Sequence, residues 1–350
     1  MTGVPTALPA PRPRDPASVP ALRWGVLGTG WIAQRFTAAL QRSTRQVVHA
    51  VGSRGEASAR RFAAAAGVPV AHGSYEALVA DPAVDVVYVA TPHHTHREHA
   101  LLAVAAGKHV LVEKPLGLTA AQAREVSDAA AARGVFCAEA MWTLFLPRFD
   151  VVRQVLADGL LGDVRTVLAD HGERFAPGGG HRILDPALAG GTLLDLGSYL
   201  TTLATWALGP AEVVHASGED APSGVNGQAS ALLAHAGGRQ SVLHTTLFST
   251  TPCTAVLAGT RGSLVLPTRW FTPGDVELRG SDGALLDRWR DPEPHDHGGL
   301  HHQATEVAAR VGEGATTTPL RPADDVVAGL AALDAVADRV GARYPELAGG

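Results

Sequence analysis

Short apolar segments alternate with amphipathic stretches between residues 22 and 138, and this alternation constrains the fold more than any other feature of the chain. Parallel strands need a crossover between them and are covered on both faces, so the pattern is typical of a parallel sheet flanked by helices. The expected strands are 23–27, 47–51, 84–90, 109–112 and 135–138, and the expected helices are 31–40, 56–66, 76–80, 97–106 and 119–133.

Beyond about residue 140, strand-like segments follow one another directly, separated by Gly and Pro turns. Such a succession predicts a largely antiparallel sheet. The strand candidates are 164–169, 212–216, 229–233, 240–247, 254–257, 263–266 and 276–278, and helices are expected at 149–157, 192–208, 300–311 and 323–340. We therefore expect an α/β protein with a doubly wound parallel sheet in its N-terminal part and a C-terminal α+β domain with a large open, mostly antiparallel sheet.

Composition and charge narrow the class of protein. Hydrophobic residues make up 46% and charged residues 18% of the 350 residues, which is enough to bury two cores. The net charge of −5 gives no basic excess for nucleic acid or an anionic membrane. No apolar run approaches the ~20 residues of a membrane span, and residues 1–20 are Pro-rich without the apolar stretch of a signal peptide.

The two cysteines, Cys137 and Cys253, fit no CxxC spacing, so reduced thiols and a cytoplasmic location are expected, with a single disulfide as the alternative.

The turn after the first strand has the pattern G-x-G-x-x-A over residues 28–33. Gly28 permits the tight turn, and Gly30 lets the backbone approach a pyrophosphate at the helix N-terminus. The pattern follows a strand and opens a helix, as a dinucleotide-binding Rossmann domain requires. We expect Gly28, Thr29, Gly30, Trp31 and Ile32 to contact the cofactor. The alternative is an ordinary glycine turn.

The end of the second strand indicates which dinucleotide is bound. An acidic residue there would hold the ribose 2′-hydroxyl of NAD, but the chain has Ser53 and Arg54 instead, and Glu56 follows two residues later. An arginine can pair with a 2′-phosphate and stack on adenine, so these two residues predict NADP. The alternative is a solvent-facing arginine with NAD as the cofactor.

Two further segments carry a resemblance to a known family. They are Thr91-Pro92-His93-His94-Thr95-His96 after one strand and Glu113-Lys114-Pro115 after the next. With the glycine turn they resemble the Gfo/Idh/MocA oxidoreductases. The segments 139–147 and 190–199 are similar to the branch with dimeric dihydrodiol dehydrogenase and NADP-dependent xylose dehydrogenase. Leu144 departs from an arginine frequent in relatives, which puts an inherited substrate specificity in doubt.

The resemblance implies an NADP-dependent oxidoreductase acting on a sugar, polyol or diol. The chain would then have three parts: a disordered Pro-rich tail outside the fold (1–20), the dinucleotide-binding Rossmann domain (21–141), and a substrate and oligomerisation domain (142–350). The C-terminal helix is expected to pack back on the first domain. Self-association as a homodimer or homotetramer is a further expectation. The resemblance also implies cofactor contacts from a larger set: Ser53, Arg54, Thr91, Pro92, His93, His96, Glu113 and Lys114.

The resemblance further implies a proton relay made of Lys114 and Tyr199. Lys114 would lie beside the nicotinamide, and its ammonium would lower the pKa of the Tyr199 phenol from its ordinary ~10. Tyr199 would then accept the substrate proton in oxidation and return it in reduction. The alternatives are a solvated strand-end lysine and a buried tyrosine with a satisfied hydroxyl. The Lys114–Pro115 bond can be cis or trans.

Three other residues carry weaker expectations. Asp195 lies four residues before Tyr199 and would share its helix face, but Thr192-x-x-Asp195 also matches a capping box, and both interpretations stay open. Trp142 lines the substrate side of the nicotinamide or packs in the core. Arg182 contacts substrate hydroxyls or lies on the surface.

Sixteen histidines invite a metal hypothesis, but a zinc site needs three or four convergent ligands. The group at 93–99 belongs to the strand-end pattern, and His297 and His301 fall in a polar loop, so no metal is expected. Two rival functions stay open: an NAD-dependent glycosidase of the same family, and a non-catalytic dinucleotide sensor.

Overall fold

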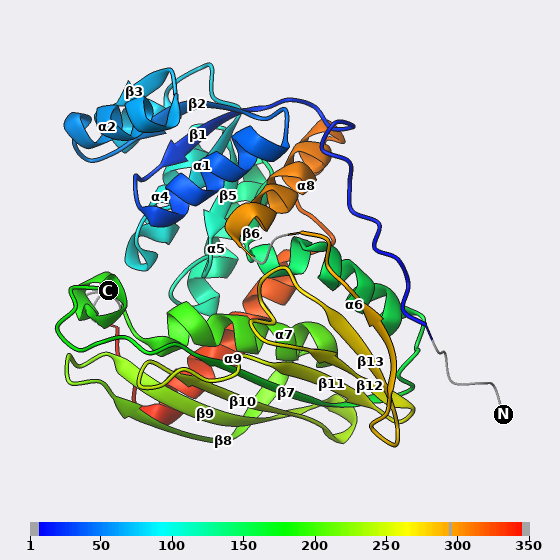
Figure 1. Cartoon of the computed structure of the whole chain (residues 1–350). Coiled ribbons are helices and arrows are strands. Elements are labelled where there is room, and N and C mark those ends of the chain that lie inside the picture. Colours follow the sequence, from blue (N-terminus) through cyan, green and yellow to red (C-terminus); the bar gives the residue numbers. More distant parts are fainter. Residues whose placement is uncertain (1–6, 294–295, 345–350) are drawn as a thin grey trace. The chain divides into compact units, whose positions relative to one another are not determined.

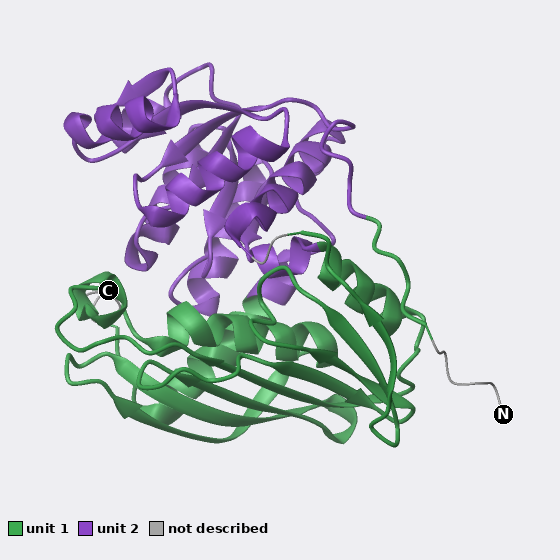
Figure 2. Ribbon diagram, in the orientation of Figure 1, with its two compact units in different colours: residues 1–12, 147–294, 327–350 green, residues 13–146, 295–326 purple. Residues whose placement is uncertain are grey.

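The computed structural model describes residues 7–293 and 296–344, which form two compact units (Figures 1 and 2). The Rossmann unit comprises residues 13–146 and 295–326 (purple in Figure 2). The large-sheet unit comprises residues 1–12, 147–294 and 327–350 (green). Each unit has its own sheet, so each is described by itself.

The Rossmann unit contains a six-stranded parallel sheet in the order β3-β2-β1-β4-β5-β6. The chain order reverses between β1 and β4, which is where ligands bind in open α/β sheets. Its strands are β1 (Arg23–Leu27), β2 (Val47–Gly52), β3 (Val70–His72), β4 (Val86–Val89), β5 (His109–Glu113) and β6 (Cys137–Ala140). Its helices are α1 (Trp31–Ser43), α2 (Glu56–Ala66), α3 (Tyr75–Val79), α4 (His96–Ala105), α5 (Ala120–Arg133) and α8 (His301–Gly312), with 3₁₀ turns η1 (His93–Thr95), η2 (Trp142–Phe145) and η7 (His297–Leu300).

Apolar packing and caps explain these elements. Strand β4 is fully buried, as expected for a central parallel strand. Phe36 of α1 stacks on Tyr88 of β4 with ring centroids 3.8 Å apart, which holds α1 against the sheet. Helices α2 and α5 end at Gly67 and Gly134, both in the left-handed conformation that glycine adopts without steric cost.

The large-sheet unit contains an eight-stranded sheet in the order β14-β13-β12-β11-β7-β10-β9-β8. All neighbours are antiparallel except β7 and β10. Helix α7 packs on one face of β7 and β10. The strands are β7 (Val164–Gly172), β8 (Ala211–Asp220), β9 (Asn226–His235), β10 (Arg239–Thr246), β11 (Ala255–Gly259), β12 (Gly262–Leu266), β13 (Val276–Gly280) and β14 (Leu285–Trp289). The helices are α6 (Pro147–Ala157), α7 (Ser198–Leu208), most of α9 (Ala323–Val340) and the short turns η3 (Arg182–Leu184), η4 (Pro186–Leu188), η5 (Leu193–Gly197) and η6 (Ala236–Gly238).

The predicted fold class is confirmed, with differences at particular elements. Strands β3 and β14 were not predicted, because β3 has three residues and β14 (LLDRW) lies at an edge without apolar alternation. The segment that returns to the Rossmann unit is 295–326, which includes α8, whereas most of α9 belongs to the large-sheet unit.

The N-terminal segment also differs from the expected tail. Residues 1–6 lie outside the described part of the chain. From residue 13 onward the segment packs on the Rossmann unit, where Val19 is buried against Ala308 and Ala309 of α8. Arg14 pairs with Glu306 of the same helix at 2.7 Å. A buried valine and an ion pair hold this Pro-rich stretch, which composition alone does not reveal.

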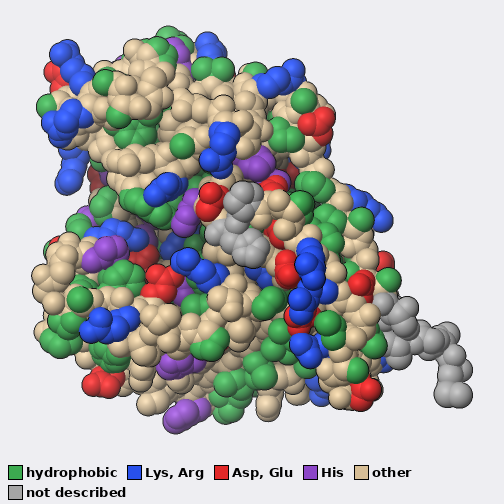
Figure 3. All heavy atoms as spheres, in the orientation of Figure 1, with side chains coloured by type: hydrophobic (Ala, Val, Ile, Leu, Met, Phe, Trp, Pro, Cys, Tyr) green, Lys and Arg blue, Asp and Glu red, His purple; other side chains and the backbone are tan. Residues whose placement is uncertain are grey.

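Among the described residues, no helix combines the length and apolar character needed to cross a membrane. On the face drawn in Figure 3, acidic and basic side chains are interspersed, with hydrophobic side chains scattered among them. That face has no extended basic surface of the kind that binds nucleic acid.

Both cysteines are free and buried, Cys137 in the Rossmann unit and Cys253 in the large-sheet unit. Burial raises the pKa of the Cys137 thiol to about 12 and also raises the pKa of Cys253. Since the thiolate is the reactive form, we expect neither cysteine to react with Ellman's reagent at pH 8 in the native protein, and both to react after unfolding in guanidinium chloride. Rapid labelling of a native thiol would contradict this burial.

Candidate cofactor and substrate sites

The glycine turn between β1 and α1 has the geometry of a dinucleotide cradle. Gly28 has φ +108°, and a Cβ there would lie 2.6 Å from the carbonyl oxygen of Ala90. Gly30 begins α1 without a side-chain cap, and a Cβ added to it would meet nothing within 4 Å. The first N–H groups of α1 therefore have no side-chain acceptor at the cap, and the space beside the Gly30 Cα is open, which fits a pyrophosphate.

The end of β2 carries the residues that predict NADP. Ser53 is buried, and Arg54 is exposed with its guanidinium near the hydroxyl of Tyr75 at the start of α3. Burial raises the pKa of Tyr75, with the Arg54 cation acting against that rise. Glu56 pairs with Arg60 of its own helix at 2.5 Å. The nearest acid is thus engaged on α2, and the described end of β2 presents a cation.

The T-P-H-H-T-H segment follows β4, and hydrogen bonds of its side chains hold it in place. Thr91 Oγ1 lies 2.9 Å from Nδ1 of His99, and burial lowers the pKa of His99, which favours the neutral ring. His93 is buried in η1. His96 is fully buried, with Nε2 2.8 Å from the Thr91 carbonyl oxygen and Nδ1 2.7 Å from the Pro115 carbonyl oxygen. The imidazole of His96 therefore joins two strand ends, so we propose that it positions the turn and does not touch the cofactor.

The E-K-P turn follows β5. Glu113 is buried and accepts a hydrogen bond from the hydroxyl of Tyr88. Lys114 is half-buried, and the Lys114–Pro115 bond is cis, which decides a point that the sequence leaves open. Leu116 donates its N–H to Glu139 Oε1 over 3.1 Å. Lys114 thus follows the C-terminal end of a central strand in a backbone held by side chains.

A cluster of three aromatic rings connects η7 with the N-terminus of α1. His297 stacks on Trp142 with ring centroids 5.3 Å apart and meets Trp31 edge-on at 4.6 Å. Trp142 is buried and Trp31 is 53% exposed. The sequence placed His297 in a polar loop, whereas the structure brings it to the glycine-turn helix. No local sequence motif indicates the contact of His297 with Trp31, because the two residues are 266 positions apart.

Asp195 and Arg182 form a bidentate ion pair in the large-sheet unit. The guanidinium of Arg182 contacts Asp195 Oδ1 at 2.8 Å and Oδ2 at 3.0 Å. The capping-box interpretation is wrong, because Thr192 has helical dihedrals, gives no cap and instead bonds Thr245 Oγ1 at 2.6 Å. Asp195 lies in the π-helical turn η5 and pairs with Arg182 of η3.

Tyr199 lies in the first turn of α7 and is surrounded by rings of the same unit. His171 lies 5.5 Å, Phe271 5.3 Å and Trp270 6.5 Å from it between ring centroids. His171 stacks on Phe271 at 3.9 Å. His171 and Phe271 were missed from the sequence because neither lies in a motif and they come from separate segments.

The predicted residues therefore fall into two groups. The Rossmann unit holds the glycine turn, Arg54, the E-K-P lysine and Trp142, and the large-sheet unit holds Arg182, Asp195 and Tyr199. Each group is assembled within its own unit. A relay through Lys114 and Tyr199 would need both units.

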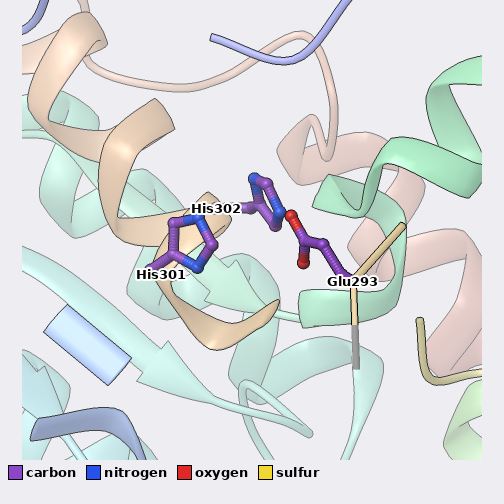
Figure 4. A group of neighbouring side chains, drawn as sticks. All are labelled: Glu293, His301 and His302. Atoms are coloured by element: carbon purple, nitrogen blue, oxygen red, sulfur yellow. The ribbon is translucent and has the colours of Figure 1, made fainter. Parts of the chain in front are cut away.

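Figure 4 draws His301 and His302 at the start of α8 together with Glu293. The two histidine rings lie 4.0 Å apart, but Glu293 belongs to the large-sheet unit. Two imidazoles of one helical turn fall short of the three or four ligands of a zinc site. The expectation that no metal is needed stays a prediction.

Comparison with known proteins gives matches to both units. Residues 22–141 match the model described as "Oxidoreductase family, NAD-binding Rossmann fold", and residues 149–265 match the Gfo/Idh/MocA C-terminal domain. The trans-1,2-dihydrobenzene-1,2-diol dehydrogenase of Macaca fascicularis is 35% identical over 338 residues, covering 93% of this chain and 99% of that protein. The Sus scrofa enzyme of the same name is 40% identical over 265 residues, covering 74% of this chain and 78% of its own.

Solved structures show the same architecture. KijD10, a 3-ketoreductase from Actinomadura kijaniata solved with NADP and TDP-benzene, is 29% identical with a TM-score of 0.80, covering 92% of this chain and 98% of that chain. Structures of its variants with one lysine or one tyrosine replaced also match. A levoglucosan dehydrogenase with NADH and levoglucosan has a TM-score of 0.83 at 18% identity over the same shares, which shows the fold alone.

Alanine substitutions of the two glycines of the turn should cause different defects. Gly28→Ala places a Cβ against the Ala90 carbonyl at a positive φ, so we expect a loss of more than ~1 kcal/mol of stability. Gly30→Ala meets no protein atom, so the unfolding temperature should stay near wild type while NADPH affinity falls, because the methyl group occupies the approach of the pyrophosphate. Thermal unfolding and NADPH fluorescence titration separate the two effects. Unchanged NADPH binding by the Gly30 variant would remove the turn from the cofactor site.

Proposed function

Since the chain belongs to the Gfo/Idh/MocA oxidoreductase family and is an NAD(P)-dependent dehydrogenase of that family, we propose that it transfers a hydride between NADP and a hydroxyl-bearing carbon of a sugar, polyol or diol. The observation that carries the proposal is the E-K-P turn. It places Lys114 after a central strand of the same sheet whose first turn is the glycine cradle. Ligands of open α/β sheets gather at this edge.

The names of the relatives support the substrate class. The mammalian relatives are named for a cyclic diol, and KijD10 is a ketoreductase solved with a TDP derivative. Both activities interconvert a carbinol carbon and a carbonyl. The aromatic surroundings of Tyr199 and the ion-paired Arg182 offer ring surfaces and hydrogen-bond donors, which suit a cyclic polyhydroxylated substrate.

The described residues fit the dinucleotide. The N-terminus of α1 would hold the pyrophosphate, Arg54 and Ser53 the 2′-phosphate, and Glu113, Lys114 and His93 the nicotinamide ribose. When bound, the nicotinamide supplies the acceptor or donor of the hydride. The stacked pair of Trp142 and His297 offers an apolar surface beside the glycine-turn helix, which would exclude water from the cofactor.

Proton transfer falls to the chain's own residues. In oxidation, the Tyr199 phenolate takes the proton of the substrate hydroxyl, and in reduction the phenol returns it. The Lys114 ammonium favours the phenolate by opposite charge and polarises the substrate oxygen. Asp195 pairs with Arg182, so its role is to orient that arginine toward substrate hydroxyls. The proposed relay uses one residue of each unit.

Replacing either relay residue should abolish turnover without abolishing cofactor binding. We expect Lys114→Ala and Tyr199→Phe each to lower kcat by roughly 10²–10⁴-fold, which is the contribution of general acid–base catalysis. Because Tyr199 belongs to the other unit, NADPH affinity should be unchanged in Tyr199→Phe. Steady-state kinetics with trans-1,2-dihydrobenzene-1,2-diol and NADP⁺, and NADPH titration, measure both. Near-wild-type kcat in either variant would exclude that residue from the relay.

Arg54 should determine the cofactor. Arg54→Ala is expected to raise KM for NADP by roughly 10–100-fold through the loss of a charge-assisted pair, with KM for NAD little changed. Arg60→Ala is a matched control, because Arg60 is also an exposed arginine, lies on the next helix and pairs with Glu56. The comparison is kcat/KM for both cofactors. A wild-type preference for NAD, or an Arg54 variant indistinguishable from the Arg60 variant, would contradict NADP specificity.

The open face of the large sheet supports self-association. Leu168 of β7 and Val242 of β10 are direct neighbours, 43% and 48% exposed, and Val256 continues their row on β11. An apolar row across a sheet suits a second copy related by two-fold symmetry. We expect the wild type to sediment as a dimer or larger and the double variant Leu168→Asp, Val242→Glu as a folded monomer. A monomeric wild type would contradict the assignment.

A further inference from the structure

The backbone that follows Lys114 is held from two sides by buried side chains. The carbonyl oxygen of Pro115 lies 2.7 Å from His96 Nδ1, and the N–H of Leu116 donates to Glu139 Oε1 over 3.1 Å. His96 is 0% and Glu139 is 1% exposed. The peptide group that joins Pro115 to Leu116 is therefore held at both its carbonyl oxygen and its N–H by side chains of α4 and β6.

The contacts of His96 involve two backbone carbonyls. Its two ring nitrogens lie 2.7 and 2.8 Å from the carbonyl oxygens of Pro115 and Thr91. A carbonyl oxygen only accepts, so both contacts are hydrogen bonds only when both nitrogens carry a proton. A ring that donates to either carbonyl lies between the turn after β4 and the turn after β5, so His96 links these two turns.

Glu139 is in turn held by the buried guanidinium of Arg321. Its Oε2 accepts from Arg321 Nε at 2.9 Å and pairs with Nη2 at 2.7 Å, and both side chains are 1% exposed. Both guanidinium nitrogens converge on this one oxygen, and the other carboxylate oxygen, Oε1, accepts from the Leu116 N–H. Arg321 comes from the segment before α9, about 200 residues beyond the lysine in sequence. The sequence offers no motif for this pairing.

We propose that Glu139 and Arg321 are positioning residues that, with His96, fix the backbone from which Lys114 extends. Arg321 orients the carboxylate, the carboxylate holds the Leu116 N–H, and His96 holds the Pro115 carbonyl on the other side. A lysine on a fixed backbone presents its ammonium at one place, which proton relay requires because small misplacements cost rate steeply. This inference rests on the proposed role of Lys114.

A cavity next to the pair provides a matched control. It has a volume of about 320 Å³ and is lined by Glu139, Arg321 and a second ion pair, Arg124–Asp324, with 2.7 Å between N and O. That second pair joins α5 to the first turn of α9, and in the described part of the chain its hydrogen bond does not reach the E-K-P turn. Asp324→Asn therefore removes a neighbouring ion pair while leaving the backbone of residues 115–116 untouched.

The first measurement is amide hydrogen exchange over residues 114–118 in the full chain, which needs no substrate. Glu139→Ala should speed exchange of the Leu116 N–H by about tenfold or more, because its acceptor is lost, whereas Asp324→Asn should leave it unchanged. Exchange at the wild-type rate in folded Glu139→Ala would overturn the proposal, as would equal acceleration in both variants.

The second measurement is catalysis of trans-1,2-dihydrobenzene-1,2-diol oxidation by NADP⁺. Glu139→Ala and Arg321→Met should each lower kcat by roughly 10–100-fold with NADPH affinity within about threefold of wild type. The double variant Glu139→Gln, Arg321→Met keeps an acceptor for Leu116 and removes both charges, so it should recover most of kcat. Folded single variants with wild-type kcat would overturn the proposal.

Lys114→Ala separates this inference from the proposed function. If Lys114→Ala keeps wild-type kcat, the relay itself fails, whatever the Glu139 variants do. If Lys114→Ala is inactive and folded Glu139→Ala is fully active, only the positioning role fails. If the wild type does not oxidise this diol, the exchange measurement alone decides whether Glu139 holds the turn.

Discussion

The structure of the Rossmann unit depends on how three strand ends are held at one edge of a parallel sheet. After β1, β4 and β5 the chain leaves the hydrogen-bonded ladder, and its peptide groups need other partners. Gly28 donates to Gly52, His96 contacts the carbonyls of Thr91 and Pro115, and Glu139 accepts from Leu116. Because these partners are buried, the loops become rigid enough to present a cofactor cradle and a lysine at fixed positions.

Much of the Rossmann unit could be predicted from sequence because its determinants are local. Apolar periodicity predicts the strands and helices, and the spacing of Gly28 and Gly30 predicts the tight turn between β1 and α1. Contacts that close over long sequence distances could not be predicted: Arg321 with Glu139, and His297 with Trp31 and Trp142. The capping box failed for a related reason, since Thr192 and Asp195 found partners in tertiary structure that local propensity does not encode.

The two units contribute different chemistry to the proposed reaction. The Rossmann unit provides cations, with Arg54 for a 2′-phosphate and Lys114 for the reacting oxygen. The large-sheet unit provides Tyr199 among aromatic rings and an arginine oriented by Asp195. The proposed cofactor residues lie at one edge of the parallel sheet, whereas the rings around Tyr199 come from several separate segments.

The most direct test of the central claim is the stoichiometry of NADP⁺ reduction across a panel of sugars, polyols and diols, followed by absorbance at 340 nm together with product analysis. The account predicts that one NADPH accumulates for each hydroxyl group oxidised to a carbonyl. Glycoside cleavage without net NADPH, as in an NAD-dependent glycosidase, or NADPH binding without turnover of any compound, as in a sensor, would contradict it.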